Sequence, residues 1–318
     1  MRPKTITVAP PLPDDDAFAT KQQPSASGFI LMTSGAAKTQ GADRDALCLA
    51  QTLSAAGELT MNGAYACSNL DCPRVVTIYA TIDLSARTFT IRGTSPANGR
   101  HQVDTISGPN NSTVRSSKVF SAVLQVHCNN TITKDAEVGF QAVGTPSEAC
   151  RVKITASQDE SGVSYTLHGR DQYGRYRTET GTLPNATIQL SMRNYDRIIG
   201  LDLSSACASI IQLGTATQAE SKWVPVDRNS PRTLVDVQLF ASADFEHSVQ
   251  WTAEDIRSTE FAASRQLPTS PFVHTVTETA TTVSANYILE KPMTAVRLAV
   301  DSYASGKANM RIVQERPH

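Results

Sequence analysis

The residue types that could do chemistry in this chain are spread thinly along it. Its six histidines occur singly, at positions far apart in the sequence: His101, His127, His168, His247, His274 and His318. A metal site needs several ligands that converge, often as a near pair on one face of an element. Each histidine is therefore better explained as a surface or packing residue than as a ligand, and the sequence predicts no metal site.

Acidic residues and serines form no catalytic pattern either. The run Asp14–Asp16 lacks the alternating ligands and the glycine of a calcium loop. Asp159-Glu160 and Glu254-Asp255 read as turn carboxylates, and nothing indicates the facing carboxylate pair that a glycosidase needs. No Gly-x-Ser-x-Gly motif exposes a serine, and no glycine-rich turn leads into a helix that could hold a phosphate. We therefore predict no catalytic residue, no cofactor and no enzymatic activity.

The six cysteines are equally scattered, and they lack the paired Cys-x-x-Cys spacing of a zinc site. They lie at Cys48, Cys67, Cys72, Cys128, Cys150 and Cys207. Cys67 and Cys72 are the closest pair and would be able to bridge if oxidised. Because the first sixteen residues contain no apolar core of an export signal, we expect buried or free thiols instead.

Composition sets further bounds. The formal net charge is −1, from 29 basic and 30 acidic residues, which argues against electrostatically driven nucleic-acid binding. No apolar run approaches the 18 residues of a membrane span. A length of 318 residues is enough for two or three domains. Only 19% of the residues are charged, while Thr, Ser and Ala are abundant, which suits β-sheets with polar outer faces.

One strand pattern occurs twice, at 88–145 and again at 164–215. Matching residues keep their order, and most lie 75 or 76 positions apart: Phe89 with Tyr165, Ile91 with Leu167, Gly93 with Gly169, Phe120 with Tyr195, Val123 with Ile198 and Val126 with Leu201. At the ends, Val143-Gly144-Thr145 matches Leu213-Gly214-Thr215 at an offset of 70, which predicts that the second copy has lost a few residues. Ordered matches of this kind indicate a duplicated domain.

Each copy alternates apolar and polar residues and places turn residues every 8–12 positions, as an antiparallel β-sandwich does. The glycines of Ala97–Arg100 and Gln172–Arg175 supply the turns. We expect one short helix at Ala46–Ala55, capped by Asp43 or Asp45. Near the end of the chain, Ala295–Val300 and Ala308–Val313 are expected to pair as a final hairpin.

The predicted fold is thus all-β, with tandem antiparallel β-sandwich domains of which two are an internal duplication. The expected boundaries are an extended N-terminal arm at 1–27, domain 1 at 28–145, domain 2 (the repeat of domain 1) at 146–218 and domain 3 at 219–318.

The arm contains one short alternating segment, Thr5, Ile6, Thr7 and Val8, followed by the Pro-rich, acidic residues 9–16. Such a composition cannot bury enough surface to order itself. We expect Thr5–Val8 to add as a strand to the exposed sheet edge of a neighbouring subunit. These four residues are the predicted interface.

The repeated pattern resembles β domains of virion proteins from tailed bacteriophages. The residues that carry the resemblance are Phe89–Gly93, Asn98-Gly99, Gly108-Pro109-Asn110, Thr113-Val114, Ser116, Phe120 and Val123. The second copy departs from it, with Gly181–Asn185 in place of the tight Gly-Pro-Asn turn and Tyr195 in place of Phe120. Trp223–Asp227 and Ser248–Asp255 look like another part of the same repertoire. The resemblance covers residues 72–318.

This resemblance implies a non-enzymatic structural protein of the virion, assembled in the host cytoplasm with copies of itself and with other virion proteins. Domains in series suit a bridging position in the neck or tail, and a capsid decoration (cement) protein is the alternative. A carbohydrate- or receptor-binding, adhesin-like module is a third hypothesis. It predicts exposed aromatic side chains near Trp223, Trp251, Tyr173 or Tyr176, although nothing in the sequence indicates glycan binding.

Overall fold

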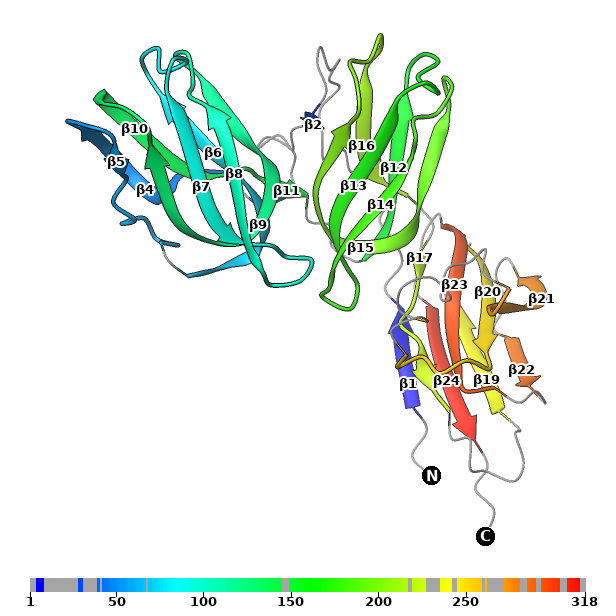
Figure 1. Ribbon diagram of the computed structural model, residues 1–318. Coiled ribbons are helices and arrows are strands. Elements are labelled where there is room, and N and C mark those ends of the chain that lie inside the picture. Colours follow the sequence, from blue (N-terminus) through cyan, green and yellow to red (C-terminus); the bar gives the residue numbers. More distant parts are fainter. Residues whose placement is uncertain are drawn as a thin grey trace.

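The computed structural model describes residues 4–8, 28–30, 39–40, 42–66, 68–144, 149–216, 219–226, 235–241, 245–258, 261, 271–280, 285–289, 293–303 and 308–314. In these residues the fold is all-β, with four antiparallel sheets and no α-helix (Figure 1). The sheets make three units that follow one another along the chain. The prediction of an all-β protein with antiparallel sheets is confirmed.

The first unit is a seven-stranded sheet that wraps around its own apolar core. The order is β4-β10-β6-β9-β7-β8, with β5 paired to β9. Its strands are β4 (Asp43–Leu53), β5 (Gly57–Glu58), β6 (Asn69–Ala80), β7 (Thr88–Thr94), β8 (His101–Ser107), β9 (Thr113–Cys128) and β10 (Ile132–Phe140). Alternation along the strands gives this sheet one buried face and one exposed face. In β7, for example, Phe89 and Ile91 are fully buried while Arg92 is exposed.

The second unit is an eight-stranded sheet built around β15, which pairs with four other strands. The order is β14-β13-β15-β11-β3, while β12 pairs with β15 and β16, and β2 pairs with β15. Its strands are β2 (Gly28–Ile30), β3 (Thr39–Gln40), β11 (Val143–Gly144), β12 (Cys150–Ala156), β13 (Ser164–Asp171), β14 (Tyr176–Thr182), β15 (Ile188–Leu203) and β16 (Ile211–Thr215).

The third unit packs two sheets face to face. One has the order β1-β24-β19-β22, and the other β17-β23-β20-β21 with β18 paired to β23. Met310 of the first sheet and Val249 and Leu298 of the second belong to one buried cluster, which makes this unit a sandwich. Its strands are β1 (Lys4–Val8), β17 (Ala219–Glu220), β18 (Val224–Pro225), β19 (Val235–Ala241), β20 (Phe245–Thr252), β21 (His274–Ala280), β22 (Ala285–Leu289), β23 (Ala295–Tyr303) and β24 (Ala308–Gln314).

The first two units repeat the same construction down to single hydrogen bonds. In the first unit Ser116 Oγ accepts from the Val76 amide at 2.9 Å and donates to the Lys118 carbonyl at 2.7 Å. Ser191 Oγ makes the corresponding pair of bonds in the second unit. The turn glycines are also equivalent, with φ of 68° at Gly99 and 78° at Gly174.

The end of the duplicated pattern is placed differently from the prediction. Ala80 pairs with Ala136 in the first unit, and the equivalent Ala156 pairs with Ile211 in the second. Strand pairing therefore matches 138–140 with 213–215 at the same offset of 75, and the predicted loss of residues is wrong. Val143–Gly144 forms β11 instead, which pairs with β15. Val143-Gly144 and Leu213-Gly214 are similar in sequence but lie in strands that are not equivalent, β11 and β16.

The predicted helix at Ala46–Ala55 is also wrong, because residues 46–53 of this segment lie in β4. Its backbone is hydrogen-bonded along both edges. One edge pairs with β10, and on the other the carbonyls of Ala46 and Leu47 accept hydrogen bonds from the amides of Tyr65 and Gly63. Partners far along the chain thus override a weak local helix preference.

Several strands near the two ends of the chain belong to other sheets than the predicted domain boundaries place them in. Ala295–Val300 and Ala308–Val313 are not a hairpin, because β23 and β24 belong to different sheets of the sandwich. Strands β2 and β3, placed by prediction in domain 1, pair with β15 and β11 of the second unit. The N-terminal strand β1 joins the third unit.

Equivalent glycines in β7 and β13 generate the first testable prediction. A Cβ atom at Gly93 would lie 2.1 Å from the Ala122 carbonyl oxygen, and one at Gly169 2.3 Å from the Tyr195 ring. We expect Gly93→Ala and Gly169→Ala each to lower the free energy of unfolding by about 1–3 kcal/mol or more, measured by urea denaturation. Gly162→Ala is the control, because no atom lies within 4 Å of that Cβ. Equal stability of all three variants would contradict the tight strand packing.

Candidate functional site

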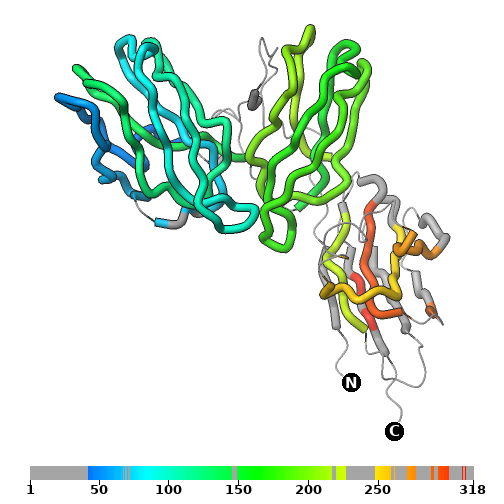
Figure 2. The backbone as a smooth tube through the Cα atoms, in the orientation of Figure 1, coloured from blue at the N-terminus to red at the C-terminus, as the bar shows by residue number. Residues whose placement is uncertain are grey.

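Residues from separate sheets converge at the two junctions between units, and these junctions are the candidate site. Figure 2 shows the first and second units side by side and the third unit joined to the lower end of the second. The first junction is apolar. A buried cluster joins β6 and β9 of the first unit to β11 and β15 of the second through Cys72, Val75, Val119, Val143 and Ile199.

A histidine and a tyrosine of the second unit border this apolar cluster. Tyr176 packs against it, and its hydroxyl shares a 2.6 Å hydrogen bond with His168 Nδ1. Burial lowers the pKa of His168 from 6.5 to about 4 and raises the pKa of Tyr176 to about 12. Both side chains are therefore neutral at physiological pH, as their apolar surroundings require.

A groove of about 470 Å³ lies beside the cluster, between the first and second units. Its lining includes three cationic side chains, Lys118 of β9, Arg177 of β14 and Arg193 of β15, and no carboxylate is among the lining residues that the structure describes. Ser95 and Ser117 add hydroxyl groups from the first unit. The groove is thus a basic, hydroxyl-lined space between two sheets.

The cations of this groove are held by contacts outside it. Lys118 Nζ donates to the Val103 carbonyl at 2.6 Å. Arg177 Nε donates to Asp171 Oδ2 at 3.1 Å, and the backbone amides of Tyr173 and Arg175 donate to the other oxygen of that buried carboxylate. Burial lowers the pKa of Arg193, and the charge of Arg177 acts in the same direction, while Tyr195, Glu179 and Asp171 oppose this shift.

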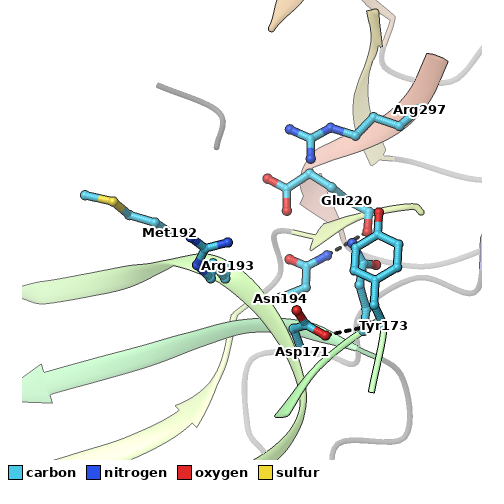
Figure 3. A pocket seen from close by; sticks show the side chains of 8 residues that line it. Asp171, Tyr173, Met192, Arg193, Asn194, Glu220 and Arg297 are labelled. Carbon is cyan, nitrogen blue, oxygen red and sulfur yellow. Dashed lines mark hydrogen bonds between the residues drawn. The ribbon is translucent and has the colours of Figure 1, made fainter. Parts of the chain in front are cut away.

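The second junction, between the second and third units, is polar (Figure 3). Arg151 of β12 forms an ion pair with Glu220 of β17, in which the side chains are 17% and 5% exposed. Asn194 Nδ2 of β15 donates to the Glu220 carbonyl at 2.6 Å. The Trp223 amide donates to the hydroxyl of Tyr173 at 3.2 Å, so the β13–β14 turn also contacts the third unit.

Arg297 of β23 closes this junction from the side of the third unit. Its Nε donates to Gln250 Oε1 at 2.7 Å, and its guanidinium lies 4.5 Å from the ring centroid of Trp223. Burial lowers the pKa of Arg297, while the charge of Glu220 opposes this shift. Arginine remains charged in proteins, so the junction holds a buried cation.

A cavity of about 20 Å³ lies at the centre of the second junction, between Arg193, Asn194, Glu220 and Arg297. Asn194 Oδ1 and Arg297 Nη2 are buried and have no hydrogen-bond partner among the described residues. A space of this size holds one water molecule, and a water bonded to both atoms would satisfy them. The cavity therefore suits a bridging water between the units and is too small for an organic ligand.

The predicted interface residues Thr5–Val8 form the strand that the sequence indicates, with a different partner. They pair antiparallel with β24 of the same chain, in the register Thr5↔Arg311 and Val8↔Ala308. Addition of this strand to a neighbouring subunit stays a prediction. Residues 9–27 of the predicted arm lie outside the described residues.

The other candidates for chemistry stay apart in the structure. No group of three histidine, cysteine or acidic residues is close enough for a metal ion within the described residues. The five described cysteines are buried, while Cys67 lies outside the described residues, as does Asp14–Asp16. No described helix is long and apolar enough to span a membrane.

The aromatic residues that an adhesin-like module would expose take part in internal contacts. Trp223 is 7% exposed and packs edge-on against Phe261. Tyr173 and Tyr176 make the junction contacts described above. Trp251 is half-buried against the core of the third unit and stacks on His274. These side chains do not form an open platform for a sugar.

Sequence reasoning missed the junction residues Arg151, Asn194, Glu220 and Arg297. One signal was available, because Arg297 interrupts the apolar strand Ala295–Val300. A charge at the centre of such a strand must be paired if it is buried. Its partners, however, lie in other strands far along the chain. No protein-family model matches this chain, and a comparison with curated proteins finds no match.

The buried histidine at the first junction generates a prediction on pH. The pKa of His168 is lower in the folded state, so the unfolded chain binds the proton more tightly. The stability from this group is complete above pH 6.5 and is lost as the pH falls toward 4. A pKa decrease from 6.5 to about 4 corresponds to about 3 kcal/mol. We expect His168→Gln to flatten the pH dependence of the unfolding free energy in that window.

The control for this measurement is His101→Gln, because His101 is exposed on β8. Its pH profile should follow that of the unchanged protein. A His168→Gln profile as steep as that of the unchanged protein would show that the imidazole is not protected from protonation.

Proposed function

We propose that this chain is a non-enzymatic structural protein of the virion of a tailed bacteriophage, in the neck or tail region. It would assemble with copies of itself and with neighbouring particle proteins. The observation that carries the proposal is the position of β1 at the edge of a sheet in the third unit, where it pairs only with β24 among the described strands.

An edge strand that pairs along one side only is well suited to exchange between copies. β1 contributes five backbone pairs with β24 and is followed by residues 9–27, which separate it from β2. The same strand of another copy can replace it without loss of a single pair, and this is the principle of domain swapping. Exchange would link the subunits of a ring while the sheet itself stays unchanged.

The opposite edge of the same sheet supports contacts with other proteins. β22 ends the sheet, and its Ile288 is 66% exposed, the largest exposure among the described large apolar side chains. The unpaired backbone groups of such an edge strand are a surface on which a strand of another protein can pair. The third unit thus has one edge for the arm and one edge for a neighbour.

The two junctions fit a protein that transmits mechanical force between its neighbours. The first buries apolar side chains of both units, and the second buries an ion pair together with side chain–backbone hydrogen bonds. Units joined in this way keep a fixed spacing, which a bridge between layers of a particle requires. The sequence resemblance to tailed-bacteriophage proteins points to the same class of function.

Strand exchange is tested with two single-cysteine variants, Thr7→Cys and Asn309→Cys, carried by separately tagged copies. These positions are directly opposite each other in the β1–β24 register. After co-expression and oxidation, we expect a disulfide between the two tagged copies, seen as a heterodimer under non-reducing denaturing conditions. The heterodimer should form in assembled particles or purified oligomers.

The register control replaces Asn309→Cys with Val313→Cys, which lies four residues further along β24 and should give no bridge to Thr7→Cys. Light scattering of the unchanged protein gives the oligomeric state in parallel. A monomer in which disulfides form only within a double variant, and never between copies, would contradict arm exchange.

A further inference from the structure

We infer that an apolar face on the second unit binds the third unit of a second copy of this chain. This apolar face is the outer surface of the part of the sheet formed by β16, β12 and the first half of β15, and it carries Ile188, Leu190 and Ile210. The contact rests on the proposed strand exchange between copies and adds a second attachment to it.

Strand pairing places these side chains on one surface. Thr155 of β12 lies between Ile188 of β15 and Gln212 of β16. Leu190 lies two residues after Ile188, and Ile210 lies two residues before Gln212, where a backbone hydrogen bond continues the pairing with β12. Residues two apart in paired strands point to the same face. Ile188 is 56% exposed and Ile210 is 37% exposed.

The first unit shows that the fold does not require apolar residues here. Its equivalent strands β9, β6 and β10 pair in the same register, with Tyr79 between Thr113 and Glu137. The residues of the first unit at the positions of Ile188, Leu190 and Ile210 are polar or charged: Thr113, Arg115 and Asp135. Two copies of one fold thus differ in the polarity of the same face, which favours a contact made by the second unit alone.

The apolar face is too small to hold an independent partner. It spans three strands about 4.8 Å apart and about five residues of about 3.4 Å each, which gives about 250 Å² per partner. A stable interface between separate proteins buries about 800 Å² on each side. A partner that is already attached by another contact needs far less, because its effective concentration reaches the millimolar range. The face therefore suits a molecule that is tethered to this chain elsewhere.

Strand exchange supplies such a partner. A β1 strand that pairs with β24 of a second copy attaches the third unit of that copy to the first chain. Nineteen residues separate Val8, at the end of β1, from Gly28, at the start of β2. Even fully extended, they reach at most about 70 Å. Because β2 pairs with β15, the third unit of the second copy is held near the strand that carries the apolar face.

The test places the photoreactive residue benzoylphenylalanine at position 188 of the full chain. On illumination its ketone takes a hydrogen atom from a nearby C–H bond, and the two carbon radicals then join, so that no atom is lost. Copies labelled with different nitrogen isotopes are mixed at low concentration and then concentrated, and mass spectrometry maps the products. We expect crosslinks between isotopes, from position 188 to residues 219–314. The same residue at position 113, the equivalent site of the first unit, is the control and should give an at least five-fold lower yield.

A second measurement uses the residues of the first unit as replacements that this fold accepts. We expect Ile188→Thr combined with Ile210→Asp to raise the dissociation constant of the oligomer at least ten-fold, measured by light scattering over a dilution series. Val103→Thr is the matched control. Val103 is an exposed apolar residue on β8, and Thr178 is its counterpart in the second unit. This variant should associate as the unchanged protein does.

Crosslinks only within one isotope would overturn the inference in favour of this chain's own residues as the occupant. Crosslinks only to other parts of a second copy, no crosslink from position 188, or an unchanged dissociation constant would also overturn it. The bridge between Thr7→Cys and Asn309→Cys is measured in the same double variant. If that bridge persists while the expected crosslinks are absent, strand exchange stands without this contact. If the bridge is absent while the crosslinks form, the contact stands and strand exchange is refuted.

Discussion

The arrangement of the three units depends on one strand, β15, which pairs with strands of its own sheet and also contacts the first and third units. Its sixteen residues pair with β2, β11, β12 and β13. Ile199 of this strand is buried against the first unit, and Asn194 is bonded to the backbone of the third. A shift of β15 by one residue would turn each of these side chains to the opposite face. The register of one strand therefore fixes both junctions.

The two junctions hold the units by different physical means. Apolar contacts at the first junction are not directional, so they supply stability more than orientation. At the second junction, Arg151 and Glu220 are removed from water and must stay in contact, because a buried charge without its partner costs about 3–5 kcal/mol. Arg297 adds a cation above Trp223. The polar junction thus sets the orientation of the third unit relative to the second. The apolar junction stabilises the contact between the first and second units.

The sequence allowed the fold class and the duplication to be predicted, because both depend on local alternation. Phe89 and Tyr165 match in type and position, and both are buried in the structure. The segment at Ala46–Ala55 was misread, since only its pairing with β10 makes it a strand. Glu220 and Arg297 were missed for a related reason. Their importance arises from contacts between distant strands, and local patterns in a single sequence do not reveal which strands meet. The partner of β1, at the other end of the chain, was hidden in the same way.

The central claim is that junctions of this kind hold the three units in one fixed arrangement, as a structural building block needs. Small-angle X-ray scattering of the purified chain in dilute solution tests this claim most directly. We expect the scattering curve and its distance distribution to be reproduced by the single arrangement shown in Figure 1. A curve that can be fitted only by a mixture, with the third unit at many angles to the second, would contradict it.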